Sequence, residues 1–492
     1  MRELHTDGET ARNLAAPAYA LLVPVSICGG GGSSARSEDE TMGVEPLLAA
    51  VRSGDAQAVE ALLDAGADPD TADEHGTPAL CLAVDTFDLP VVEALLRSAR
   101  LDRAGADGRT PLLRAIDNGA RNITDALVGH GAHLWIKDAE GRDALTLARY
   151  WHETGVVTEL RRRAGRPGPV GRRTVRCEFG VTCEELSLGG LTIRTGHTAI
   201  LTSLEQRYGI IVPFDELLSR ALAEPDVNHE VWWETTYALQ QRRHDPAVWD
   251  AAAALHDQPI PLERYFAAEV LRMINLFDES DDSPFDGRLV DLFLPWVARE
   301  PDPRVTRSLT AGLADAQDPR AQEPLPELTR HFDSNVRQWA VGGLHRAVEA
   351  KSPQALEAVV ERTGDEDAAV RRAACMALAS APPHTAGVSD VLAACLDDPD
   401  ETVRAEAAAV LPCAMIRAAT KFCAVSTPQT RQTRAPRTTG CSMTCPDTAS
   451  FGTLTHKEST PHAAADMDDA RDDTPPQARA ATLDAQPRQP NR

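Results

Sequence analysis

Two groups of cysteine and histidine residues have spacings that could support chemistry. Near the carboxyl end, Cys441, Cys445, His456 and His462 follow the order C-x3-C-x10-H-x5-H, which is close to that of a zinc site. A zinc site of this kind has about twelve residues before a pair of histidines carried on a helix. Pro461 lies between the two histidines here and opposes such a helix. We therefore expect no metal ligands and no cofactor.

The second group could form a nucleophile and its base. Cys183 and His197 are residue types that act together in acyl transfer, and Glu184 or Glu185 could orient the histidine. Single cysteine and histidine residues this far apart also arise by chance, and a solvated loop explains them better. We therefore assign no catalytic residue, and keep an enzyme as the alternative.

The composition excludes several classes of protein. The chain has 492 residues, a formal net charge of −24, 42% hydrophobic residues and 4% aromatic residues. The negative charge opposes binding to phosphate backbones, so we expect no nucleic-acid partner. No apolar run approaches the roughly 18 to 20 residues that cross a bilayer, so we expect no membrane partner. The cysteines do not form the dense framework of a secreted domain, which favours a cytoplasmic protein.

Glycine-led motifs recur between residues 46 and 165 at a spacing of 32 to 33 residues. Pairs of short helical patterns lie between them, each closed by a glycine that allows a left-handed cap. A fixed period of this length indicates stacked helical repeats. The motifs are Gly76-Thr77-Pro78, Gly108-Arg109-Thr110-Pro111 and Gly141-Arg142-Asp143-Ala144, and Pro46-Leu47-Leu48 opens an earlier copy.

These copies resemble the ankyrin repeat family over residues 44–165. The likeness is carried by AVRSGDAQAVEALLDAGADPDTADEHGTPAL, LLRAIDNGARNITDALVGHGAHL and DAEGRDALTLA. The resemblance implies four helix–turn–helix units with projecting loops at residues 73–75, 107–109 and 138–140. The fourth copy lacks Thr-Pro, which fits a terminal, capping repeat. We assign the binding of a partner protein to four loop residues: Glu74, His75, Arg109 and Glu140.

A second series of repeats runs from residue 229 to residue 411. Its anchor is an apolar residue followed by a basic one, with small or apolar residues four, seven and eight positions later. This spacing places the small residues on one stripe of a helix, where alanine lets neighbouring helices approach closely. The best copies begin at Val336-Arg337, Val370-Arg371 and Val403-Arg404, and looser copies begin at Val231, Glu263 and Val305.

Aspartates precede the anchors of the later copies by three residues. They are placed to accept the free backbone donors of the helix that follows, and we expect helices to begin there. We also expect each anchor arginine to bond to an aspartate of an adjacent repeat rather than to DNA. The aspartates are Asp302, Asp333, Asp367 and Asp400.

The second series resembles HEAT repeats of the short bacterial kind also found in phycobilin lyases. The segments DSNVRQWAVGGL, DEDAAVRRAACMAL and DDPDETVRAEAAAVL carry this likeness. The resemblance implies a curved stack of helix pairs, and it does not imply an enzyme.

Residues 166–228 connect the two series. Seven arginines stand between residues 161 and 176, before the next acid, Glu178. We interpret this run as a solvated linker, with a docking strip for an acidic partner as the alternative. Residues 186–194 suggest a short hairpin, and helical patterns follow at 199–208 and 214–223.

The sequence thus predicts an all-α chain of two α-solenoids, with a small irregular connector and disordered ends. The ends are a leader over residues 1–43 and a tail over residues 412–492. We expect a scaffold or adaptor that binds a protein on the concave surfaces of both stacks, without catalysis of its own. The alternative is a HEAT-repeat enzyme, with lyase-like or modifying activity, whose pocket lies near the connector.

Overall fold

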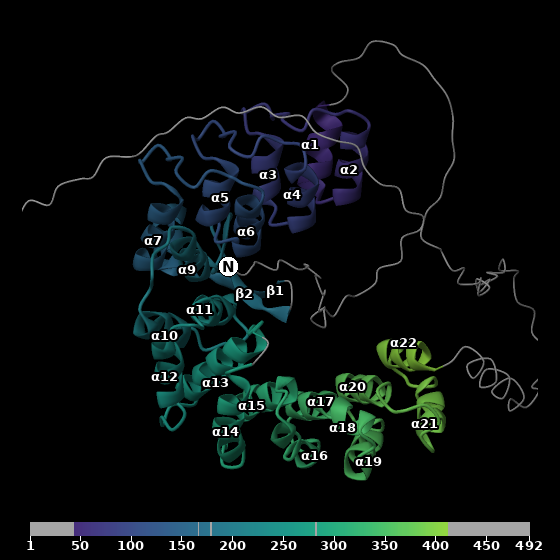
Figure 1. Ribbon diagram of the computed structural model, residues 1–492. Helices are drawn as coiled ribbons and strands as arrows, with labels where there is room; N and C mark the ends of the chain where they lie inside the picture. The colour runs from purple at the N-terminus through teal and green to yellow at the C-terminus, as the bar shows by residue number, and fades with distance from the viewer. Residues whose placement is uncertain (1–43, 166, 178–179, 281–282, 412–492) are drawn as a thin grey trace, which may run out of the picture. The chain divides into compact units, whose positions relative to one another are not determined.

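The computed structural model describes residues 44–411, apart from residues 166, 178–179 and 281–282 (Figure 1). The predicted leader, the predicted tail and the cysteine–histidine group at 441–462 lie outside the described residues. Within the described part, no helix is long and apolar enough to span a bilayer. The described chain consists of short helices and one small sheet, which confirms the predicted fold class.

Residues 44–164 form helix pairs that stack on their neighbours in sequence (Figure 1). Each first helix contacts the first helix of the next pair, and α2, α4 and α6 contact one another in the same order. Leu47, Leu80 and Leu112 have almost no exposed surface within this stack. The first helices are α1 (Val44–Ser53), α3 (Ala79–Asp85), α5 (Pro111–Asp117) and α7 (Ala144–Thr154), and the second helices are α2 (Ala56–Asp64), α4 (Leu89–Leu96), α6 (Arg121–Gly129) and α8 (Val156–Ala164).

Side-chain caps fix where several of these helices begin. Asp88 accepts a hydrogen bond from the backbone N–H of Val91, and Asp143 accepts one from Thr146. Thr110 caps α5 in the same way, and Pro111 follows it at the first helical position, where a missing N–H costs nothing. The Thr-Pro of the sequence motif is therefore a helix start.

The connector contains a three-stranded antiparallel sheet in the order β1-β2-β3. Its strands are β1 (Gly171–Arg176), β2 (Thr182–Leu188) and β3 (Leu191–Arg194), so the predicted hairpin is present. The interpretation of the arginine run as a solvated linker is wrong. Arg172 and Arg173 lie on edge strand β1, where each pairs with a glutamate of β2. The strand could not be predicted from the sequence, because its residues are almost all exposed and show no alternation of apolar and polar side chains.

The connector belongs to both apolar cores. Leu186 of β2 and Ile200 of helix α9 (His197–Arg207) pack in the core of the first stack. Leu217 of helix α10 (Phe214–Leu222) packs in the core of the second stack. The two parts meet across polar groups, including an ion pair in which Arg121 lies 2.8 Å from Glu234.

Residues 230–410 form a second stack of helices. Helices α11, α13, α15, α17, α20 and α22 contact one another in that order, while the remaining helices pack against them. Their bounds are α11 (Glu230–Gln240), α12 (Pro246–Ala254), α13 (Pro261–Leu276), α14 (Asp286–Val297), α15 (Pro303–Asp315), the 3-10 turn η2 (Pro319–Gln322), α16 (Leu325–Leu328), α17 (Ser334–Gly343), α18 (His345–Glu349), α19 (Pro353–Arg362), α20 (Ala368–Leu378), α21 (Val388–Cys395) and α22 (Glu401–Val410).

The aspartates that precede the anchors are helix caps, as predicted. Asp333 accepts hydrogen bonds from the backbone of Asn335 and Val336, and Asp400 does so from Thr402 and Val403. Asp302 and Asp367 cap α15 and α20 in the same way.

The anchor arginines join successive repeats. The guanidinium of Arg337 donates two hydrogen bonds, of 2.9 and 2.8 Å, to Asp365 of the following repeat. Arg371 binds Asp398 in the same manner, at 2.7 and 2.8 Å. Arg337 also donates to the carbonyls of His331 and Phe332, so its donors are largely satisfied. The predicted structural role of these arginines is confirmed for both pairs.

We predict that Arg337→Met lowers the free energy of unfolding by roughly 2 to 3 kcal/mol, because it leaves the buried carboxylate of Asp365 with a longer ion pair to Arg362 and one hydrogen bond from the backbone of Asp367. Urea unfolding followed by circular dichroism measures this loss. Arg304→Met is the matched control, because Arg304 is 42% exposed and pairs with Asp302 inside its own repeat. Equal losses in both variants would contradict a role for Arg337 between repeats.

Candidate functional site

Three loops of the first stack share one backbone geometry. In each, an N–H near the start of the loop donates to a carbonyl four residues later, in the pairs Asp73–Thr77, Gly105–Arg109 and Asp138–Arg142. Glycines with positive φ close the turns at Gly76, Gly108 and Gly141, where a side chain would be strained. The loops are therefore preformed turns.

Aspartate side chains hold two of these turns from within. Oδ1 of Asp73 accepts hydrogen bonds from the backbone of His75 and Thr77. Oδ1 of Asp138 accepts them from Glu140 and Arg142. Backbone hydrogen bonding lowers the pKa of Asp73, and Asp138 also has a lowered pKa because its hydrogen bonds with Arg142 outweigh burial. Both carboxylates stay charged and keep the loop tips in place.

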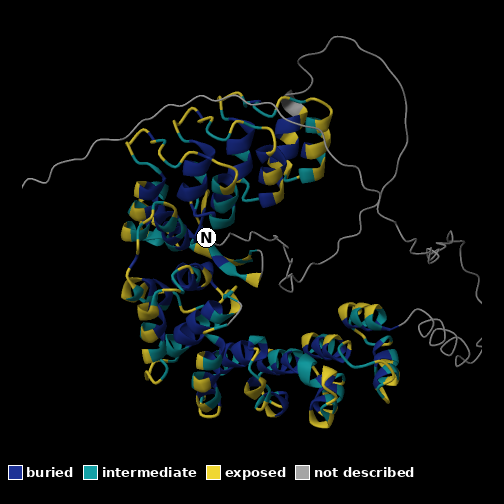
Figure 2. Ribbon diagram, viewed as in Figure 1, coloured by how far each residue is buried: buried dark blue, intermediate teal, exposed yellow. Residues whose placement is uncertain are grey.

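The tips of these loops face solvent, and Figure 2 shows exposed residues along them. The side chains of Glu74 and His75 are 83% and 77% exposed, and that of Glu140 is 60% exposed. Arg109 differs, because its side chain is only 21% exposed and forms an ion pair with Asp117. The structure thus places three of the predicted binding residues at loop tips and the fourth behind them.

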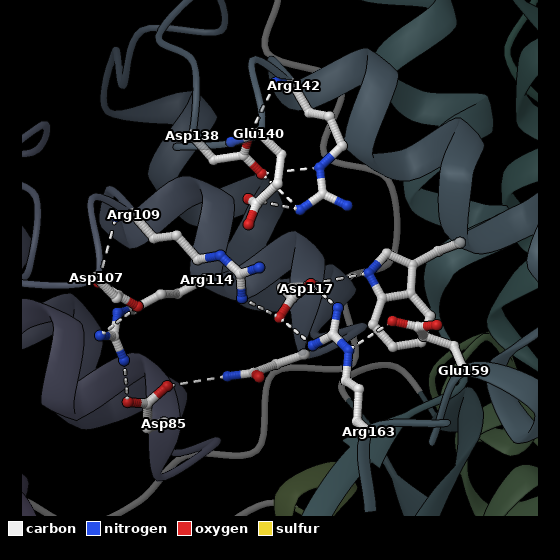
Figure 3. A network of polar contacts seen from close by, with 12 residues as sticks. Asp85, Asp107, Arg109, Arg114, Asp117, Asp138, Glu140, Arg142, Glu159 and Arg163 are labelled. Atoms are coloured by element: carbon white, nitrogen blue, oxygen red, sulfur yellow. Dashed lines mark hydrogen bonds and ion pairs between the residues drawn. The ribbon is translucent and has the colours of Figure 1, made fainter. Parts of the chain in front are cut away.

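Asp117 is the centre of a polar network behind the loops (Figure 3). It accepts hydrogen bonds from Nε1 of Trp151 at 3.0 Å and from Arg163 at 2.6 and 2.8 Å, in addition to Arg109. Burial alone would raise the pKa of Asp117, but the hydrogen bonds and charges of the two arginines outweigh it and lower the pKa. Arg163 continues the network to Glu159 at 2.7 Å.

A second branch of the network links neighbouring repeats. Arg114 donates to Asp85 of the preceding repeat at 2.6 Å and to Asp107 of the loop at 2.9 Å. Asn118 also donates to Asp85, at 3.1 Å (Figure 3). The loops are thereby joined to the helices by charged contacts, and a change in one contact affects several residues.

An exposed aromatic residue lies beside the third loop. Trp135 is 65% exposed and stacks on Tyr208, with ring centroids 4.9 Å apart. It precedes the turn that begins at Asp138 by three residues, and sequence reasoning missed it. Trp232, Trp249 and Trp296 are buried, whereas Trp233 is 40% exposed.

The structure does not form the proposed nucleophile pair. Among the described residues, no hydrogen bond joins Cys183 to His197. His197 is buried, stacks on Trp151 at a centroid distance of 4.3 Å, and has no partner at Nδ1. Glu184 and Glu185 pair with arginines of β1 instead of orienting the histidine. Burial and a hydrogen bond to Cys177 raise the pKa of Cys183, which opposes nucleophilic chemistry.

A cavity of about 480 Å³ lies where α9, α10 and α11 meet. Its lining includes Gln206, Arg207 and Tyr237, together with Glu234. Burial raises the pKa of Glu234 to about 7, although Arg121 beside it favours the charged form. A carboxyl group that titrates near neutrality could exchange a proton with a bound molecule. The cavity lies between helices of the connector and the first helix of the second stack.

Comparison with known families identifies the repeats. Residues 47–138 match the family of ankyrin repeats, in three copies. Residues 325–412 match the family of HEAT repeats. No curated protein is similar to the chain at a significant level. The likeness to the phycobilin-lyase type of HEAT repeat remains a prediction.

We predict that His197 makes the stability of the chain sensitive to acid. Burial lowers the pKa of His197 to about 4, whereas an unfolded histidine titrates near its ordinary value of 6.5. Between these values only the unfolded chain binds the proton, so stability falls by up to roughly 3 kcal/mol as the pH drops from about 6.5 to about 4.

The measurement is urea unfolding of the wild type and of His197→Gln across this pH range. The difference in free energy between them should shrink as the pH falls. Other buried groups that titrate, such as His229 and Glu234, are common to both proteins. His130→Gln, at an exposed position, serves as the control. Parallel pH profiles for wild type and His197→Gln would show that the buried ring does not titrate as stated.

Proposed function

The chain contains ankyrin repeats and HEAT repeats, and we propose that it is a scaffold or adaptor that binds a partner protein along its ankyrin loops. Repeats of both kinds are typical modules of protein interaction. The observation that supports the proposal best is the row of preformed loops with exposed tips. Loops that are ordered before binding lose little conformational entropy in a complex, which raises affinity.

The predicted binding residues divide into two roles. Glu74, His75 and Glu140 offer exposed polar groups that can contact a partner directly. Arg109 holds the second loop against Asp117 and acts as a positioning residue. Trp135 adds an exposed aromatic surface near the third loop, and tryptophan is the residue type most often found at energetic centres of interfaces.

The HEAT stack supplies a second long surface in this proposal. Its anchor arginines are occupied by aspartates of neighbouring repeats, which leaves them poorly suited to binding a phosphate backbone. We place the scaffold in the cytoplasm, where buried thiols such as Cys81 and Cys375 remain reduced.

An enzyme remains the second candidate, and the cavity beside Glu234 favours it. In that case a small molecule would bind between α9, α10 and α11 and raise the melting temperature of the chain. Tyr237→Ala, which alters the cavity lining, would abolish that rise while the binding of a protein partner stayed unchanged.

We predict that the triple variant Glu74→Ala, His75→Ala, Glu140→Ala weakens partner binding by roughly tenfold or more. Truncation at most interface positions costs less than about 1 kcal/mol, and three losses of about 0.5 kcal/mol together reach the roughly 1.4 kcal/mol that corresponds to tenfold. Affinity capture with quantitative mass spectrometry identifies the partner, and titration of that partner measures the change. The melting temperature should stay within error, because these side chains are mostly exposed and the ion pair of Glu140 with Arg142 lies at the surface.

Two controls separate binding from stability. The first control changes Gln57, Glu60 and Glu93 to alanine. These three residues are exposed on second helices away from the loops, so this variant should bind the partner normally. The second is Arg109→Ala, which should lower the melting temperature because Asp117 loses one of its partners. If the triple variant captured the partner as well as the wild type does, the loops would not be the binding site.

A further inference from the structure

Two cysteines meet at the end of the β1–β2 hairpin. The backbone N–H of Cys177 donates to the carbonyl of Val181 at 2.8 Å and closes the turn, while Cys183 lies on β2. The hairpin brings the two Sγ atoms to 3.7 Å from each other. Cys183 is 1% exposed and Cys177 is partly buried.

Glu230 lies against the same two sulfur atoms. It is the first residue of α11 and is 2% exposed, and its Oε1 atom has no hydrogen-bond partner. A carboxylate oxygen of Glu230 and the two Sγ atoms all lie within 4.8 Å of one another. An unpartnered carboxyl group in such a place costs several kcal/mol unless something else stabilises it.

The backbone around Glu230 fixes its position. A Cβ atom on Gly196 would lie 2.2 Å from Oε1 of Glu230 and 2.5 Å from the carbonyl oxygen of Gly119. Glycine at position 196 therefore lets the carboxyl group occupy a cradle between the first stack and the connector.

We propose that Cys177, Cys183 and Glu230 bind one zinc ion. Tetrahedral zinc with Zn–S bonds of about 2.3 Å separates two sulfur ligands by about 3.7 Å, which matches the separation of these Sγ atoms. A carboxylate oxygen binds zinc at about 2.0 to 2.2 Å, which places it about 3.6 Å from each sulfur ligand. The atoms of Glu230, Cys177 and Cys183 lie within 4.8 Å of one another, so a shift of roughly 1 Å brings Glu230 into range. Water completes the fourth position.

The charges at the site suit a divalent cation with affinity for sulfur. With a metal bound and the protons displaced, two thiolates and a carboxylate would carry three negative charges, and the nearby cations Arg121 and Arg194 would offset them only in part. Thiolate ligands select zinc over magnesium or calcium, which prefer oxygen. Zinc binding releases the thiol protons, and so it strengthens as the pH rises.

The ion would join the connector to the first HEAT helix. The hairpin already contacts the segment just before this helix through the backbone N–H of Thr182, which donates to the carbonyl of Asn228 at 2.8 Å. Thr182 also bonds to Asp226 at 2.8 Å. Zinc would bind Cys177 and Cys183 of the hairpin and Glu230 of α11. It would thereby stabilise the junction between the two stacks.

The test measures zinc in the purified full-length chain by mass spectrometry of the metal. The background variant is Cys441→Ser, Cys445→Ser, which removes the other cysteine pair with a zinc-like spacing. About one zinc per chain is expected in this background. Adding Cys177→Ser and Cys183→Ser should abolish binding, and adding Glu230→Gln should weaken it by at least roughly tenfold, as even the loss of an outer-shell partner does.

Two matched controls accompany these variants. Cys375→Ser, Cys395→Ser alters another buried thiol pair, and Glu234→Gln alters the next carboxyl group along α11. Both should retain the zinc. Circular dichroism confirms that Glu230→Gln is folded, and Co²⁺ substitution should give a thiolate-to-metal absorption band that this single change weakens.

Three results would overturn the proposal. The first is a background variant that neither contains zinc nor binds added zinc. The second is zinc that persists without Cys177 and Cys183. The third is a thiol titration of the unreduced, denatured chain that finds these two cysteines joined in a disulfide.

Discussion

A pair of short helices cannot bury its apolar side alone, and this constraint determines the arrangement of the described chain. Each pair buries that side against the next pair, as α17 does between α15 and α20. Leu80 and Leu112 of the first stack and Val336 and Val370 of the second are buried in this way. Repeats of this kind must extend along a line, because every new pair covers one neighbour and exposes another face. A long surface follows from the packing itself.

Charged side chains fix how successive repeats are oriented on this apolar packing. Arg337 and Arg371 each form a two-bonded contact with a carboxylate of the following repeat. In the first stack, Asp117 accepts hydrogen bonds from Trp151 and Arg163 (Figure 3). Hydrogen bonds of this kind require one geometry, whereas apolar contacts tolerate sliding. These contacts fix the positions of the loops that carry the proposed binding residues.

The sequence predicted features that depend on nearby residues and missed those that depend on distant ones. Helix starts at Asp302 and Asp400 could be predicted because a cap and its helix are adjacent. The partner of Arg109 could not, since Asp117 at the end of α5 becomes its acceptor only when the loop before α5 directs Arg109 along that helix. The approach of Glu230 to Cys177 likewise depends on how the hairpin packs against α11.

The most direct test of protein binding by the ankyrin loops is hydrogen exchange of the full chain, free and with its co-purified partner. The account predicts slower exchange in the complex at residues 73–77, 105–109 and 138–142, with unchanged exchange over α2, α4 and α6. Slower exchange confined to the cavity between α9, α10 and α11, with the three loops unaffected, would contradict it.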